Sequence, residues 1–179
     1  MTLPTPVLRH WKEADFAPFA QMNADPAVMR HFLSPLSREE SRISFEKIRS
    51  TLEEKQWGIW VVEYAGEFAG MVGLNVSQWT LPFSPRTEIL WRLHSKFWGK
   101  GIAFQAAQQT LQHGFQKLGL PEIVAFTTPP NFRSIRLMER LGFTRDAHGD
   151  FDHPAVPAGH PLRQHVLYRK RNPSAPVAG

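Results

Sequence analysis

The chain has 179 residues, of which 42% are hydrophobic and 21% charged, and it carries a formal net charge of +5 with no cysteine. This length suits one domain with a sizeable core, and the lack of cysteine excludes disulfides, thiolate metal sites and cysteine nucleophiles. No stretch approaches the roughly 20 apolar residues of a membrane span, and the N-terminus lacks a basic segment followed by an apolar run. These features predict a soluble cytoplasmic protein with no membrane partner.

The positive charge has three interpretations: a solvated surface, a site for an anionic cofactor, or a nucleic-acid interface. Basic residues are scattered, and the only tight run is Arg169-Lys170-Arg171. The sequence has no platform of aromatic and basic residues and no recognition-helix signature. Nucleic acid is therefore the least favoured partner.

The first part of the chain predicts one strand followed by helices. Asp25-Pro26 matches an N-cap with proline at the first helical position. Ser37 and Glu40 match a capping box. The expected elements are a strand over 7–11 and helices over 15–22, 27–32 and 37–52.

A run of strands follows. Aromatic and β-branched residues predict strands over 57–64, 68–76 and 87–93, with a turn at 65–66 and a loop over 79–86. On the third strand the side chains alternate between two faces. Ile89, Trp91 and Leu93 share one face, and Glu88, Leu90 and Arg92 share the other.

The C-terminal half alternates helices and strands. The expected elements are a helix from about 103 to 118, a strand over 123–128, a helix over 134–141, a strand that begins at 143, a loop over 146–161 and a strand over 165–169. This order predicts a central sheet covered by helices, of the α/β or α+β class. We expect a single domain over residues 1–171 and a flexible tail over 172–179.

The most informative local feature is Gly99-Lys100-Gly101, which lies between a predicted strand and a predicted helix. The first helical turn presents unpaired amides and a positive dipole end, and glycine lets a phosphate approach them. Two known phosphate loops are absent: there is no Gly-x-x-x-x-Gly-Lys-Ser/Thr, and position 104 is Phe where Gly-x-Gly-x-x-Gly needs glycine. A flexible helix entry is the alternative.

Two longer segments occur in a characteristic order. EILWRLHSKFWGKGIA covers residues 88–103, and NFRSIRLMERLGF covers residues 131–143. Together they resemble the GNAT superfamily of N-acetyltransferases, most closely its branch of ribosomal-protein N-terminal acetyltransferases. The resemblance covers nearly the whole chain. It implies a mixed, mostly antiparallel sheet of about seven strands with one splayed parallel pair, and about four flanking helices.

The resemblance implies that acetyl-coenzyme A is the co-substrate and that no metal is needed. The family loop Gln/Arg-x-x-Gly-x-Gly/Ala maps onto Trp98 to Ala103, where Trp98 departs from the broad pattern but suits this branch. Main-chain amides of the loop would hold the pyrophosphate, and the pantetheine would lie beside the third strand. The implied cofactor-binding residues are Trp91, Leu93, Trp98, Gly99, Lys100, Gly101, Ile102, Ala103 and Asn131.

Acetyl transfer to an amine needs a base for the amine, a donor for the carbonyl oxygen and an acid for the thiolate. By resemblance, Glu88 is the candidate base and Ser134 the candidate acid, while an amide near Trp91 or Arg92 is the candidate carbonyl donor. The alternatives are a solvent-facing Glu88 and a Ser134 that only helps Asn131 to cap the next helix.

Other features leave alternatives open. The aromatic residues of the loop over 79–83 would contact an apolar part of the acceptor or pack on the domain. The carboxylates and imidazoles from Asp150 to His165 lack the compact spacing of a metal site, so turn and surface roles are favoured. The leading function is an acetyl-CoA-dependent N-acetyltransferase. The alternative is a non-catalytic acyl-CoA sensor or scaffold. The acceptor, a protein N-terminus or a small-molecule amine, stays open, as does a homodimer.

Overall fold

The computed structural model describes residues 4–175 and divides the chain into two compact units. Unit 1 contains the chain up to Gly73 together with Leu90–Ala107, and unit 2 contains Leu74–Ile89 and the chain from Gln108 onward. The single domain over 1–171 and the flexible tail stay predictions, and tail residues 176–179 lie outside the described residues. Within residues 4–175, no helix is both long and apolar enough to cross a membrane.

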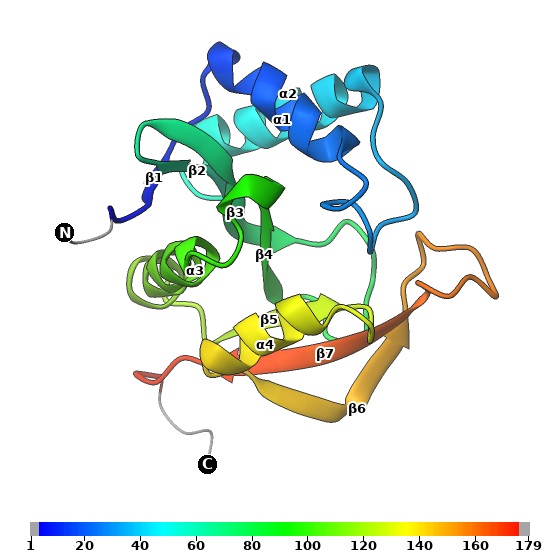
Figure 1. Ribbon diagram of the computed structural model, residues 1–179. Coiled ribbons are helices and arrows are strands. Elements are labelled where there is room, and N and C mark those ends of the chain that lie inside the picture. The colour runs from blue at the N-terminus through cyan, green and yellow to red at the C-terminus, as the bar shows by residue number, and fades with distance from the viewer. Residues whose placement is uncertain (1–3, 176–179) are drawn as a thin grey trace. The chain divides into compact units, whose positions relative to one another are not determined.

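Unit 1 is built from a three-stranded antiparallel portion and two N-terminal helices (Figure 1). Its elements are β1 (Val7–Arg9), α1 (Phe16–Ala24), α2 (Arg38–Lys55), β2 (Ile59–Tyr64), most of β3 (Glu67–Val76), the end of β4 (Thr87–Leu93), the start of α3 (Ile102–Gln112), and short 3₁₀ helices at Glu13–Asp15 and Ser95–Phe97. The predicted capping box is confirmed at α2. The Glu40 amide donates to Ser37 Oγ at 3.1 Å, and the Ser37 amide donates to the Glu40 carboxylate at 2.7 Å.

The core of unit 1 is aromatic. Phe45 of α2 is 0% exposed. Its ring meets Trp11 edge-on at 5.5 Å and Phe16 at 5.5 Å between centroids. Phe19 completes the group, with its ring 5.2 Å from Trp11. Edge-to-face packing of this kind adds to the free energy gained from burying the rings. These contacts pack α1 and α2 against each other and against Trp11, which follows β1.

Unit 2 contains the remaining parts of β3, β4 and α3, followed by a π-helical turn at His113–Lys117, β5 (Glu122–Thr127), α4 (Phe132–Arg140), β6 (Thr144–Asp152) and β7 (Gln164–Arg171). β5 and β7 pair antiparallel, as do β6 and β7. α4 contacts β5 and lies along it in Figure 1. Asn172 donates side-chain hydrogen bonds to the carbonyls of Phe115 and Leu120, so the chain is still hydrogen-bonded just past β7.

The strands form a seven-stranded sheet in the order β1-β2-β3-β4-β5-β7-β6. β4 and β5 form its parallel pair, with Thr87 opposite Ile123 and Glu88 opposite Val124. With α1 to α4 among the described residues, this confirms the predicted fold class: a mixed sheet of seven strands with one parallel pair and four helices.

Two element predictions were wrong. Residues 27–32 form separate turns and no helix, although Asp25 does accept a hydrogen bond from the Ala27 amide at 2.8 Å. So short a segment forms too few hydrogen bonds to offset the cost of starting a helix. The expected loop over 146–161 begins as strand, because β6 continues to Asp152 across a register shift between Asp146 and Phe151. Pairing with β7 and a bulge accommodate residues that locally favour turns.

We predict that Phe45→Ala lowers the free energy of unfolding by about 3–5 kcal/mol, because it empties a fully enclosed site. Ile43→Ala on the same helix removes a side chain that is 65% exposed and should change it by less than about 0.5 kcal/mol. Urea denaturation followed by circular dichroism measures both. Equal losses in the two variants would contradict the assignment of this core.

Candidate functional site

The chain leaves β4 and enters α3 in unit 1 through the predicted glycine loop. Gly99 and Gly101 both have φ of +75°, in the left-handed region that side chains disfavour. The Gln105 amide donates to the Gly101 carbonyl at 3.1 Å, which places Gly101 directly before the first turn of α3, where helix amides point out of the helix end. These amides and the dipole give this end of α3 a partial positive charge.

Open space surrounds both glycines. A Cβ atom at Gly99 would meet nothing within 4 Å, and one at Gly101 would meet only the side-chain nitrogen of Gln105 at 4.0 Å. Backbone conformation therefore explains the glycines, and crowding by the protein does not. The backbone here remains approachable, as a diphosphate ligand requires.

Trp98 fixes the start of the loop. Its indole N–H donates to the carbonyl of Leu93 at 3.0 Å and so ties the loop to the end of β4. Ile102 as a whole residue is only 1% exposed, so its side chain is packed inside the protein and it offers a ligand little surface. Lys100 is exposed, with its ammonium 5.7 Å from the centroid of the Phe97 ring.

The candidate base belongs to unit 2. Glu88 is half-buried on β4, and its carboxylate accepts a hydrogen bond of 2.7 Å from the side-chain amide of Asn75 on β3. Burial raises the pKa of Glu88 to about 7, and the bond from Asn75 opposes part of that rise. A carboxyl with this pKa is present in both protonation states at neutral pH, which suits proton transfer.

Asn131 and Ser134 meet at the start of α4. The Ser134 amide donates to the side-chain oxygen of Asn131 at 3.4 Å, and the Asn131 amide group donates to Thr127 Oγ1 at 2.8 Å. Asn131 is thus the N-cap of α4 and Ser134 supplies the capped amide, which is the arrangement expected in the alternative to an acid role for Ser134. Any role of these two residues toward a ligand stays a prediction.

The aromatic loop and the acidic segment have structural partners. Leu81 and Phe83 are each 4% exposed and pack in the core of unit 2, whereas Trp79 remains exposed. The carboxylates of Asp150 and Asp152 pair with Arg145 and Arg163. His153 and His165 lie against Phe126 and Phe151. Within residues 4–175, no group of three or more His, Asp or Glu side chains is placed to hold a metal.

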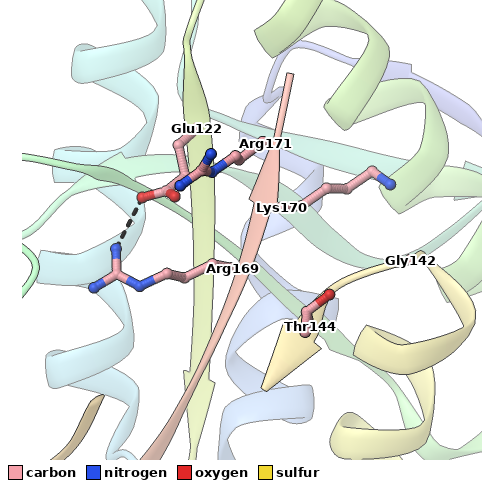
Figure 2. Close-up of a pocket in the computed structure, with 6 residues that line it drawn as sticks. All are labelled: Glu122, Gly142, Thr144, Arg169, Lys170 and Arg171. Atoms are coloured by element: carbon pink, nitrogen blue, oxygen red, sulfur yellow. Dashed lines mark hydrogen bonds and ion pairs between the residues drawn. The ribbon is translucent and has the colours of Figure 1, made fainter. Parts of the chain in front are cut away.

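A cavity of about 330 Å³ in unit 2 contains none of the predicted site residues. Figure 2 shows its lining, which is Glu122, Gly142, Thr144, Arg169, Lys170 and Arg171. Glu122 accepts from Arg169 at 2.8 Å and lies 3.4 Å from Arg86. We interpret this cavity as the surroundings of an ion-pair cluster that joins β5 to β7.

From the sequence, we missed two polar side chains near the predicted site residues. They are those of Asn75, which bonds to Glu88, and of Arg92. Asn75 interrupts an otherwise apolar strand, and that interruption was the available signal. Arg92 was named only for its main chain, yet burial lowers the pKa of its guanidinium to about 10. A charged residue in a strand of largely apolar residues was the signal there.

Comparisons with known proteins converge on one kind of domain. A family model described as an acetyltransferase (GNAT) domain matches residues 7–144. The FsC-acetyl coenzyme A-N(2)-transacetylase of Aspergillus fumigatus is 28% identical over 131 residues, which make up 69% of this chain and 56% of that protein. The chain therefore spans just over half the length of this relative.

Two solved structures share the fold. A GNAT-family acetyltransferase from Bacillus anthracis has a TM-score of 0.76 at 24% identity, with 96% of this chain and 98% of that chain covered. RimL, a ribosomal L7/L12 alpha-N-protein acetyltransferase in complex with coenzyme A, has a TM-score of 0.74 at 20% identity, with 93% and 94% covered. These likenesses show that the chain shares the fold of both structures.

We predict that Asn75→Ala raises the pKa of Glu88 above its value of about 7, because the lost amide N–H favoured the ionised carboxylate. Asn75→Asp should raise it further, since a second negative charge would lie beside the first. Carboxyl ¹³C NMR titration measures the change, with the exposed Thr80→Ala as control. A pKa that stays unchanged or falls in both variants would remove Asn75 from this role.

Proposed function

The chain belongs to the acetyltransferase (GNAT) family, and on that premise we propose that it is an acetyl-coenzyme A-dependent N-acetyltransferase acting on a primary amine. The observation that carries the proposal is the loop at the start of α3, where two left-handed glycines leave main-chain amides approachable. The Aspergillus relative is named for acetyl-coenzyme A, and RimL was solved with coenzyme A. Both support the choice of co-substrate.

The loop residues fit a diphosphate. The Trp98 amide donates to the Ser95 carbonyl at 3.1 Å, so amides between Gly99 and Ala103 would bind the phosphate oxygens, and the exposed Lys100 ammonium would add a positive charge. Along β4, Trp91 and Leu93 would lie beside the pantetheine, and Asn131 would hydrogen-bond it. Bound acetyl-coenzyme A would supply the activated acyl group.

Proton transfer is the task we assign to Glu88. An amine is protonated near neutral pH and must lose a proton to attack a carbonyl carbon. With a pKa of about 7, Glu88 is partly ionised and can accept that proton directly or through water. Ser134 is the proposed donor to the departing thiolate. No covalent intermediate on the protein is required, which agrees with the lack of cysteine.

The acceptor is a protein N-terminus or a small-molecule amine, and the cytoplasm is the proposed location. A thiol-release assay with acetyl-coenzyme A and a panel of amines tests the function. Release that depends on an added amine supports an N-acetyltransferase. Tight cofactor binding without release on any amine would instead favour an acyl-CoA sensor or scaffold.

Gly101→Glu should weaken acetyl-coenzyme A binding by about a hundredfold or more, because a carboxylate would repel the diphosphate at the amides that bind it. Gly66→Glu is a matched control, since Gly66 also has a left-handed φ, of +79°, and open space around its Cβ position. Isothermal titration calorimetry measures both affinities. Similar affinity in the two variants would take the loop out of cofactor binding.

Glu88→Gln should lower kcat by about a hundredfold or more while it leaves acetyl-coenzyme A affinity near its original value. In the parent enzyme kcat/KM should rise with pH through about 7, because only ionised Glu88 accepts a proton. That ascending limb should vanish in the variant. Steady-state rates from pH 5 to 9, about two units on either side of this pKa, measure it. If the rise of kcat/KM with pH persists unchanged in Glu88→Gln, another group is responsible for it.

A further inference from the structure

We propose that Arg92 binds the carboxylate of the acceptor, so that the preferred acceptor is an amine that also carries a carboxyl group, as an amino acid does. This inference rests on the proposed N-acetyltransferase function, because it names the class of amine. It is carried by the surroundings of Arg92 within unit 1.

A buried neutral network holds one end of the guanidinium. Arg92 Nη1 donates to the side-chain oxygen of Asn23 at 2.8 Å, and Asn23 Nδ2 donates to Ser41 Oγ at 3.2 Å. Asn23 and Ser41 are both 0% exposed. Their bonds fix the position of the guanidinium but supply no negative charge.

No counter-ion accompanies this charge. Among residues 4–175, Arg92 forms no ion pair, and its Nε is buried without a hydrogen-bond partner. Burial lowers the pKa of Arg92 to about 10, which still leaves it protonated near neutral pH. A half-buried cation with a buried Nε and only neutral partners is unfavourable, and proteins usually pair such a charge.

Arg9, another arginine of unit 1, has the carboxylate partners that Arg92 lacks. Its guanidinium donates to both carboxylate oxygens of Asp15 at 2.8 Å, and it also pairs with Glu63. Two carboxylates therefore neutralise the charge of Arg9. Among residues 4–175, no carboxylate forms an ion pair with Arg92, which lies in the same unit. The difference indicates that the counter-ion of Arg92 comes from a ligand.

The unpartnered edge has the shape of a carboxylate. Because Asn23 takes Nη1, the Nε and Nη2 groups remain, and their parallel N–H bonds match the two oxygens of a carboxylate. Phe32 covers one face of the guanidinium, with its ring centroid 4.4 Å from Cζ. An anion must therefore approach along the edge.

The turns over residues 26–34 lie beside the guanidinium, since Phe32 covers one of its faces. Phe32 and Leu33 in these turns are 45% and 50% exposed. Arg92 Nε is shut off from solvent here, so a carboxylate reaches it only after neighbouring side chains shift. Segments without a helical or strand ladder open at a low free-energy cost.

An oxyanion could also come from the phosphates of the cofactor. The glycine loop at the start of α3 already provides amides for those phosphates, whereas Arg92 is held by Asn23 of α1, which in turn bonds to Ser41 of α2. We therefore assign Arg92 to the acceptor carboxylate. The two sources predict different effects of the same substitution.

The test compares acceptors that differ only in the carboxylate: phenylalanine with phenethylamine, and leucine with isopentylamine. For at least one pair, the parent enzyme should prefer the amino acid in kcat/KM, and Arg92→Met should reduce that preference by about tenfold or more. Arg92→Lys should restore part of it, and Arg140→Met, at an exposed position of α4, should leave it unchanged. The proposal would be overturned if the parent enzyme showed no preference for the amino acid over the matching amine in either pair.

Acetyl-coenzyme A affinity is measured on the same variants. If Arg92→Met weakens cofactor binding about tenfold and leaves acceptor preference unchanged, Arg92 serves a phosphate and the proposal is wrong. If affinity is retained and preference falls, the acceptor carboxylate is supported.

A binding measurement separates this inference from the proposed function. In ¹⁵N NMR the Nε–H signal of Arg92, identified by its loss in Arg92→Met, should shift with phenylalanine and not with phenethylamine. A shift without any thiol release would support the carboxylate site while the proposed transferase activity fails. Thiol release that depends on an amine, together with an Nε–H signal that does not shift with any carboxylate, would refute the carboxylate site. The proposed transferase function would then still stand.

Discussion

The direction in which the chain leaves β4 depends on two residues with left-handed backbone conformation. Gly99 and Gly101 turn the chain within three residues, so that α3 begins at Ile102 with its first amides outside the helical ladder. The Trp98 indole anchors the start of this turn to the Leu93 carbonyl. The same backbone geometry that directs the chain into α3 therefore also places the positively polarised helix end on which the proposed cofactor site depends.

Two ionisable side chains of β4 are held in surroundings that disfavour their charge. Burial raises the pKa of Glu88 and lowers that of Arg92, and each has a neutral asparagine as its side-chain partner. Asn75 and Asn23 orient these groups without neutralising them. A carboxylate partner would instead have formed an ion pair, which fixes the charge state and occupies the donor atoms. Neutral partners leave Glu88 able to exchange a proton and Arg92 able to accept an anion.

The sequence allowed most of the fold to be predicted because periodicity and capping act locally. The strand over 87–93 and the capping box before α2 follow from adjacent residues. The helix expected over 27–32 had the right cap, but nothing in the sequence revealed that the segment would stay as turns. β6 exceeded its predicted length because pairing with a distant strand decided its conformation.

For the candidate site, the motif located the glycine loop and Glu88, whereas the partners of the charged groups could not be predicted. Asn75 lies 13 residues before Glu88, and Asn23 lies 69 residues before Arg92. Such pairs form only when strands and helices pack together, so a local sequence pattern cannot predict them. Burial, which sets both pKa values, is likewise a property of the folded chain.

The unpaired guanidinium of Arg92 has a consequence for how the protein would evolve or be engineered. It is a point of local frustration, since the folded chain keeps a charge that its own residues do not neutralise. Selection for stability alone would favour an apolar residue at this position. In the role we propose for Arg92, retaining arginine there trades stability of the ligand-free protein for discrimination among acceptors.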